Sequence, residues 1–259
     1  MIKDIIEVSK LAGEVIRNGF RQNFEIEYKT NSSNLVTEID KKSEELIINF
    51  VKKKYPNHGI LAEESGEKEL ESEYKWIIDP LDGTTNFAHG LPIFSVSIGV
   101  VKGKEIIAGV VYDVISDVLY CAEKGSGAYR NGSKISVNKR DDMKTSLLVT
   151  GFPYDIKDNP LNAVEHFNEF LFNSRAVRRL GSAAIDFCYV ASGVFDGFWE
   201  VTLQPWDVCA GKLIVEEAGG LVTDFDGNNY EILRERRDSV ASNGLIHNQM
   251  IEILRKNVK

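Results

Sequence analysis

The sequence predicts an α+β fold, and three observations support this class. Helical hydrophobic periodicity covers residues 2–20, 41–54, 161–173, 183–192, 207–218 and 246–256, with strand-like runs between them. Short apolar runs between residues 94 and 138 are separated by Gly or Asp, which predicts an antiparallel or mixed sheet. Further along the chain, strands and helices alternate. We expect two halves, residues 1–145 and 146–259, that form one compact unit, with most of the candidate metal ligands in the first half.

Composition limits the classes of function. A chain of 259 residues with 43% hydrophobic residues can bury a substantial core. The formal charge of −8 disfavours nucleic acid as a partner, because a polyanion normally requires a broad basic face. We interpret the basic groups as solvated surface: Lys52 to Lys54, Arg178 with Arg179, and Arg236 with Arg237.

The cysteines and histidines carry no catalytic signature. The three cysteines lie in apolar contexts without a paired spacing, which predicts small buried residues in a reducing compartment: Cys121, Cys188 and Cys209. The four histidines share no metal-ligand spacing, and we expect surface or packing roles for them: His58, His89, His166 and His247. The N-terminus is amphipathic and unlike a secretory signal, and no apolar run approaches the ~20 residues of a spanning helix. A cytoplasmic protein is expected.

The stretch from Trp76 to Phe87 carries the strongest functional signal. Its apolar start ends in Asp79 and Asp82, followed by a glycine and two threonines. Because Pro80 and Gly83 favour a turn, both carboxylates are expected at a strand end, where open α/β sheets place ligands. The competing interpretation is a tight turn with Asp at its first position and Pro at its second.

Further acids follow other apolar segments. Glu63 and Glu64 come after a predicted strand, and we expect Glu64 to point away from Glu63. Asp207 precedes a predicted helix, and Asp40 precedes the helix expected near Lys41. Either aspartate could be a helix cap, and for each one alone that interpretation stays open. Taken together, the acids favour a metal and phosphate site.

These motifs resemble the inositol monophosphatase family of metal-dependent phosphatases, within the larger group that includes fructose-1,6-bisphosphatase. The segments that carry the resemblance are LVTEID at 35–40, LAEES at 61–65, IDPLDGTTNF at 78–87, GSAA at 181–184 and WDVCAG at 206–211. Two small departures, Ala62 and Cys209, remove no ligand. The resemblance implies a layered αβαβα sandwich of the inositol monophosphatase and fructose-1,6-bisphosphatase type. The DxDGT loop of haloacid-dehalogenase-type phosphatases is a look-alike, but it has one residue between its aspartates where this chain has two.

The resemblance also implies a set of metal ligands. Glu63, Asp79 and the carbonyl of Leu81 would bind one Mg²⁺, and Asp79, Asp82 and Asp207 a second. A third, weaker ion at Glu63 is a further possibility in this family. Mg²⁺ prefers oxygen ligands, and a set without Cys or His argues against zinc.

The hypothesis for the mechanism is that a metal-activated water attacks phosphorus directly, without a phosphoenzyme. Thr84 would orient this water with Asp40 behind it, and Glu63 and Asp79 complete the expected catalytic set. A second metal would ease departure of the alkoxide. Gly83 and Thr84 would offer backbone N–H groups to the phosphate at a helix start. Capping is the competing role for Thr84 and Thr85, and we favour it for Thr85.

The resemblance assigns the leaving group to a second segment. Gly181, Ser182, Ala183 and Glu200 would hold hydroxyls, and Asp82 and Asp207 would also contact the substrate. For Ser182 an ordinary N-cap is the favoured interpretation, and Glu200 could equally face solvent. The helix from Ala183 to Ser192 has a single charge, Asp186, and is expected to be buried. A carboxylate at position 200 suits a polyol and is ill suited to a second phosphate.

The expected activity is Mg²⁺-dependent hydrolysis of myo-inositol monophosphate or a related small phosphate. Alternatives are the same chemistry on fructose-1,6-bisphosphate, the 2′-phosphate of NADP or 3′-phosphoadenosine phosphate, and, from another class, a non-catalytic metal- and phosphate-binding regulator. The resemblance further suggests Li⁺ sensitivity and a homodimer. The acidic stretch from Gly66 to Tyr74 is either a mobile loop beside the metals or, as we favour, an ordinary solvated connection.

Overall fold

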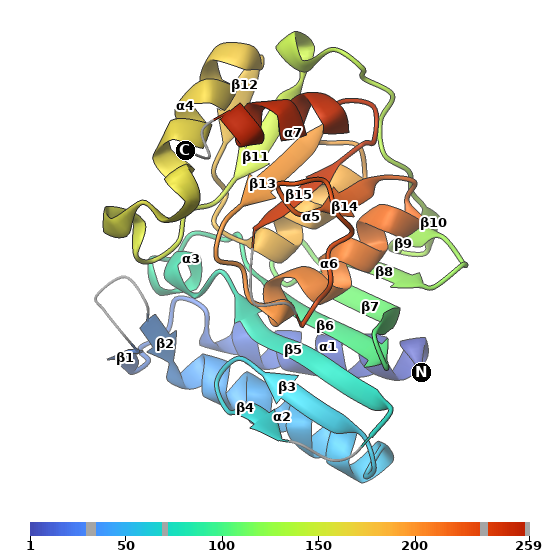
Figure 1. Cartoon of the computed structure of the whole chain (residues 1–259). Helices are drawn as coiled ribbons and strands as arrows, with labels where there is room; N and C mark the ends of the chain where they lie inside the picture. Colours follow the sequence, from blue (N-terminus) through green and yellow to red (C-terminus); the bar gives the residue numbers. More distant parts are fainter. Residues whose placement is uncertain (30–34, 69–71, 234–237, 257–259) are drawn as a thin grey trace.

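The computed structural model describes residues 1–29, 35–68, 72–233 and 238–256, and these form a layered sandwich (Figure 1). Helices α1 (Ile2–Gly19) and α2 (Glu38–Lys54) form one outer layer. An eight-stranded sheet, the helix pair α5 (Ala183–Ala191) and α6 (Pro205–Glu217), and a five-stranded sheet follow. Helices α4 (Ala163–Asn173) and α7 (His247–Lys256) form the last layer. The αβαβα sandwich expected from the sequence is confirmed.

The eight-stranded sheet has the order β10-β9-β8-β7-β6-β5-β3-β4. Only the pair β3–β5 is parallel among its described strands, so the predicted antiparallel or mixed sheet is confirmed. The strands are β3 (Gly59–Ala62), β4 (Gly66–Lys68), β5 (Tyr74–Asp82), β6 (Ser95–Lys102), β7 (Glu105–Asp113), β8 (Val118–Glu123), β9 (Ala128–Arg130) and β10 (Ser133–Lys134).

The five-stranded sheet has the order β12-β11-β13-β15-β14. Its β11 pairs in parallel with β12 and β13, whereas β15 runs antiparallel to β13 and β14. The strands are β11 (Leu147–Thr150), β12 (Ala176–Arg178), β13 (Gly197–Glu200), β14 (Leu221–Thr223) and β15 (Ser239–Ser242). A separate pair, β1 (Ile26–Tyr28) with β2 (Leu35–Thr37), leads into α2. Short helices complete the described elements: α3 (Thr84–Ala88), η1 (Met143–Thr145), η2 (Ile156–Asp158) and η3 (Pro160–Asn162).

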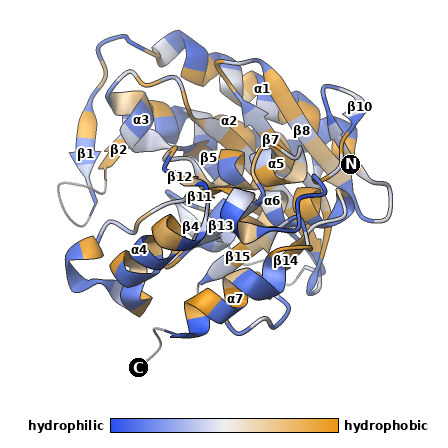
Figure 2. Ribbon diagram, turned by 90° about the horizontal axis from the view of Figure 1, so that it is seen from above, coloured by the Kyte–Doolittle hydropathy of each residue, from blue (hydrophilic) through white to orange (hydrophobic). Residues whose placement is uncertain are grey.

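The outer helices are amphipathic, as their sequence periodicity predicts. Ile5, Val8, Ala12 and Ile16 recur at helical spacing on α1, and all four are fully buried in the core under the eight-stranded sheet. Figure 2 shows hydrophobic and hydrophilic residues together on α4 and α7, which cover the five-stranded sheet with one face only.

The inner helices have no such polarity, because both sheets enclose them. Most residues of α5 and α6 are buried, which confirms the expectation for the helix from Ala183 to Ser192. Gly99 and Gly109 lie opposite each other on β6 and β7, directly beneath α6. A Cβ on Gly109 would stand 2.9 Å from Cα of Ala210, and one on Gly99 would overlap Cys209. These two glycines therefore let α6 approach the sheet closely.

Several predicted details were wrong at the ends of elements. The helices expected from 41 and 207 begin at Glu38 and Pro205. The stretch from Gly66 to Tyr74, favoured as a solvated connection, contains strand β4 at its start, paired antiparallel with β3, and Tyr74 begins β5. Residues 69–71 of that stretch lie outside the described residues.

The remaining predictions about single residues largely hold. The cysteines are free, with Cys188 and Cys209 buried and Cys121 half-buried. Lys52 to Lys54, Arg178 and Arg179 are exposed, while Arg236 and Arg237 lie outside the described residues. In the described part of the chain, no helix is both long and apolar enough to cross a membrane.

Candidate active site

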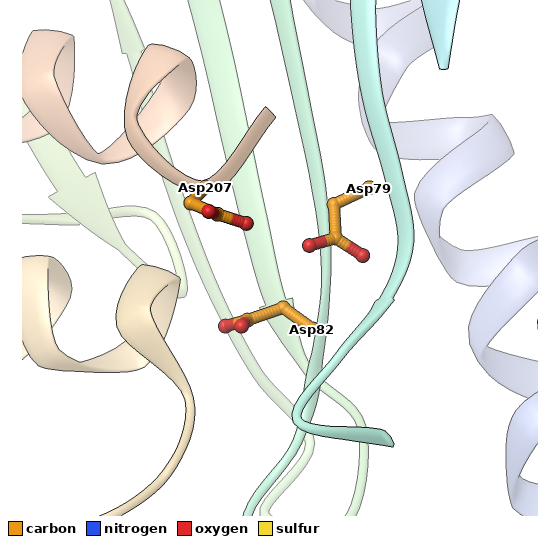
Figure 3. A group of neighbouring side chains, drawn as sticks. All are labelled: Asp79, Asp82 and Asp207. Atoms are coloured by element: carbon orange, nitrogen blue, oxygen red, sulfur yellow. The ribbon is translucent and has the colours of Figure 1, made fainter. Parts of the chain in front are cut away.

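Three aspartates gather where β5 ends and α6 begins (Figure 3). Asp79 and Asp82 come from β5 and Asp207 from the first turn of α6, and each offers a carboxylate oxygen within 4.8 Å of the others. Residues three apart on a regular strand face opposite sides. An irregularity between Asp79 and Asp82 makes these residues pair with Ser97 and Ser95, which are two apart and share a face. The two carboxylates thus meet on one side of the sheet.

The Asp82 carboxylate joins β5 to α5. It accepts hydrogen bonds from the N–H groups of Ala183 (3.2 Å) and Ala184 (2.9 Å), and from the hydroxyl of Ser182. Ser182 holds the N-cap position of α5 but makes no side-chain cap bond within the helix. Ser182 is thus the N-cap residue, as expected, but its side chain does not cap the helix, because Asp82 takes the place of the capping group for the free N–H groups of α5.

Asp40 accepts a hydrogen bond from the Thr84 side chain. It is the third residue of α2 rather than the residue before it, and its Oδ2 accepts the Thr37 N–H at 2.9 Å in a capping box. Its Oδ1 accepts a 2.9 Å hydrogen bond from the Thr84 hydroxyl. Burial raises the pKa of Asp40 to about 6, although these hydrogen bonds oppose the rise. Gly83 is the N-cap of α3, so neither Thr84 nor Thr85 caps it.

Asp207 also lies inside its helix. Gln204 is the N-cap of α6, and the Gln204 N–H donates to Oδ2 of Asp207 at 2.7 Å. The alternative interpretation of Asp207 as the N-cap was wrong by three positions. The reciprocal capping box fixes the carboxylate in the first turn, where it faces Asp79 and Asp82.

Glu63 and Glu64 bind the same lysine. The Lys29 ammonium lies 2.8 Å from Oε1 of Glu63 and 2.6 Å from Oε1 of Glu64. The expectation that Glu64 points away from Glu63 was wrong, because one ammonium attracts both carboxylates. Burial and the charge of Glu63 raise the pKa of Glu64 to about 7. Lys29 was not identified from the sequence, since it follows a three-residue strand with no local signal.

The acid cluster fits a divalent cation. Burial, together with the charges of Glu63, Asp82 and Asp207, raises the pKa of Asp79 well above its usual range. Buried carboxylates this close cannot all be ionised unless a cation compensates them. The donors are oxygen atoms only, which suits a hard cation such as Mg²⁺.

Most of the predicted site residues line one cavity of about 650 Å³. Asp40 is set behind Thr84, which lines the cavity. The lining also contains residues that were not predicted to belong to the site, among them Lys29, Tyr154, Arg179 and Asp186. The predicted residues that line it are Glu63, Asp79, Leu81, Asp82, Gly83, Thr84, Gly181, Ser182, Ala183, Glu200 and Asp207.

Glu200 lies at the end of β13 and lines the cavity. The alternative that it simply faces bulk solvent does not hold, because the side chain is half-buried at the cavity wall. Burial and the charge of Asp82 raise its pKa to about 8. Its carboxyl group packs on the backbone of Gly151, where any Cβ would overlap it.

A largely buried cluster of carboxylates at a cavity is a site in which a bound cation can act on a phosphate ester, which points to the class of metal-dependent phosphate-ester hydrolases. The model of the inositol monophosphatase family matches residues 1–259. A chloroplastic phosphatase IMPL1 of Arabidopsis thaliana is 44% identical over 96% of this chain and 68% of its own. A fructose-1,6-bisphosphatase/inositol-1-monophosphatase of Aquifex aeolicus is 38% identical over 98% of this chain and 97% of its own.

The likeness extends to solved structures. The crystal structure of the extragenic suppressor protein suhB from Bartonella henselae superposes with a TM-score of 0.93, at 36% identity, over 99% of this chain and 98% of that one. The chain belongs to the inositol monophosphatase family. It is a phosphomonoesterase of that family.

Proposed function

We propose that this phosphatase uses Mg²⁺ and that its preferred substrate is myo-inositol monophosphate, which it converts to inositol and phosphate. One observation carries the proposal: the acid cluster, Thr84 with Asp40 hydrogen-bonded behind it, and the half-buried Glu200 are grouped at one cavity. Phosphate chemistry and hydroxyl recognition can thus take place side by side.

The acids divide into two proposed Mg²⁺ sites. Glu63, Asp79 and the Leu81 carbonyl would hold one ion, and Asp79, Asp82 and Asp207 the second, with a third, weaker ion at Glu63. The cluster of Asp79, Asp82 and Asp207 supports the second site. Bound Mg²⁺ would supply a nucleophilic water at neutral pH and stabilise charge on the leaving oxygen, so no phosphoenzyme is needed.

Thr84 and Asp40 are the proposed water-positioning pair. Because the Thr84 hydroxyl donates its proton to Oδ1 of Asp40, its oxygen lone pairs remain free to accept a hydrogen bond from a water in the cavity. Oδ1 of Asp40 can receive a proton through Thr84 as the water attacks. Gly83 and Thr84 are proposed to bind the phosphate through their backbone N–H groups.

The leaving group would lie against Gly181, Ser182, Ala183 and Glu200. The half-buried carboxyl group of Glu200 can accept hydrogen bonds from hydroxyls and offers no positive charge to a second phosphate. Broad specificity is the second candidate, since the Aquifex aeolicus relative is named for both bisphosphatase and monophosphatase activity. It would include fructose-1,6-bisphosphate, NADP and 3′-phosphoadenosine phosphate.

Family membership also supports three finer proposals: inhibition by Li⁺, a homodimer, and a cytoplasmic location. The free cysteines are consistent with a reducing compartment. The division into halves at residue 145 likewise remains a proposal.

The test compares kcat/KM for Mg²⁺-dependent phosphate release from inositol 1-phosphate, fructose-1,6-bisphosphate, NADP and 3′-phosphoadenosine phosphate at equal enzyme concentration. We expect inositol 1-phosphate to dominate. Comparable rates on several substrates would establish the broad-specificity alternative, and no release from any of the four would refute the proposal.

A further inference from the structure

Asp186 is a buried carboxyl group without a partner. It is the fourth residue of α5, its exposure is 1%, and neither carboxyl oxygen has a hydrogen-bond partner among the described residues. Yet it lines the same cavity as Asp82 and Glu200. The site chemistry described above does not use it.

Among the described residues, Asp186 is the only acid whose buried carboxyl oxygens have no hydrogen-bond partner. Asp196, at 2% exposure, accepts the Leu147 N–H at 2.6 Å and pairs with Arg140 at 3.2 Å. Asp82 accepts hydrogen bonds from the start of α5. Because burying an unpaired polar group is unfavourable, an orphaned carboxyl group at a cavity wall points to a partner that enters through the cavity.

The surroundings of Asp186 select the chemistry of that partner. The charges of Glu200 and Asp82 and the burial of the group all raise the pKa of Asp186, and only Arg179 opposes them. Two carboxyl groups at one wall offer hydrogen-bond acceptors, and donors when they hold a proton, so they suit neutral hydroxyls, which can both donate and accept hydrogen bonds. The wall formed by Asp186 and Glu200 therefore fits a polyol better than a second phosphate.

We propose that Asp186 is a specificity-determining residue that hydrogen-bonds a hydroxyl of a polyol leaving group, beside Glu200. This inference rests on the proposed function and deepens it. The phosphate-binding half of the site does not depend on Asp186, so a substrate without leaving-group hydroxyls should be indifferent to this side chain.

The experiment measures kcat/KM with Mg²⁺ for inositol 1-phosphate and for phenyl phosphate, whose leaving group carries no further hydroxyl. The variants are Asp186→Ala and Asp186→Asn. For Asp186→Ala we expect a loss of about tenfold or more on inositol 1-phosphate and a change within about twofold on phenyl phosphate. Asp186→Asn keeps hydrogen-bonding capacity and should retain more of the inositol 1-phosphate rate than Asp186→Ala.

Stability gives a second readout. An unpartnered buried acid destabilises the free enzyme, so Asp186→Asn should raise the unfolding temperature at pH 8, whereas an acid with a structural role would lower it when replaced. Asp113→Asn is the matched control, because Asp113 is a buried acid outside the cavity lining. It should leave the ratio of the two kcat/KM values unchanged.

Equal losses on both substrates, or no loss on inositol 1-phosphate, would overturn the assignment of Asp186. Turnover of phenyl phosphate but not of inositol 1-phosphate by the wild type would overturn it as well. A wild type that hydrolyses neither substrate refutes the proposed function itself, which separates the two failures. If Asp186→Ala does not fold, the kcat/KM values and the unfolding temperature of Asp186→Asn test the assignment instead. A lowered unfolding temperature with equal changes on both substrates would then overturn it.

Discussion

The Thr84 hydroxyl lies 2.9 Å from Oδ1 of Asp40, although 44 residues separate them along the chain. Asp40 is held in turn by the Thr37 N–H at 2.9 Å. The start of α2 and the start of α3 are thereby connected through one buried carboxylate. This connection places a hydroxyl oxygen at the cavity wall in a single orientation.

Replacing Thr84 with Val removes the hydroxyl at nearly constant volume. If Thr84 orients the attacking water, kcat should fall about 100-fold or more with Mg²⁺ saturating. Thr85→Val is the matched control, since Thr85 is exposed on the same helix and should tolerate the change. A kcat within about threefold of wild type for Thr84→Val would contradict the proposed role.

Asp82→Asn should abolish turnover in a folded protein. The substitution removes a charge from the cluster and brings an amide group against the N–H groups of Ala183 and Ala184. Circular dichroism would establish folding, and titration calorimetry with MgCl₂ should show weakened binding. Wild-type activity in this variant would remove Asp82 from the proposed metal ligands.

The metal-free protein should lose stability between pH 7 and pH 9. The folded-state pKa values of Glu64 and Glu200 are raised to about 7 and about 8, above those of the unfolded chain. The folded state therefore binds more protons, and the free energy of unfolding falls as pH rises through these values. Added Mg²⁺ should raise the unfolding temperature more at pH 8.5 than at pH 7, which scanning calorimetry can check. A metal-free protein that is more stable at pH 9 than at pH 7 would contradict this.

Lys29→Met should destabilise the metal-free protein by about 1–3 kcal/mol, because Glu63 and Glu64 lose the cation that they share. Saturating Mg²⁺ should reduce the difference. Lys41→Met is the control, since its pair with Glu27 is exposed and is expected to contribute less than about 1 kcal/mol. Urea unfolding with and without Mg²⁺ measures both effects, and equal losses in the two variants would argue against a special role for Lys29.

Gly109→Ala should lower both stability and activity. The new Cβ would meet the Cα of Ala210 at 2.9 Å, so α6 must shift and carry Asp207 away from Asp79. We expect a loss of about 1–3 kcal/mol by thermal unfolding and a reduced kcat/KM. Gly59→Ala, whose Cβ would have ordinary contacts from 3.6 Å, should behave like wild type. Unchanged activity in Gly109→Ala would show that the close approach of α6 is not needed.

Local patterns in the sequence determined the architecture and most of the site. Hydrophobic periodicity located the main helices, and acids after short apolar runs located the candidate ligands, because both signals depend on near neighbours. The starts of α2 and α6 are also marked by a local sequence signal, the capping box. Thr37 with Asp40, and Gln204 with Asp207, stand at the spacing of a capping box.

Only the tertiary structure decided how side chains from distant segments face one another. The irregularity in β5 turned Asp79 and Asp82 to the same side of the sheet. Lys29 forms ion pairs with Glu63 and Glu64, more than 30 residues further along the chain. Asp186 looked like the single charge of a buried helix, and its position on the cavity wall emerged from packing between the two sheets. Such contacts depend on the angles and distances at which helices and strands pack, and on which polar groups this packing leaves without partners. The spacing of residues along one segment determines neither of them.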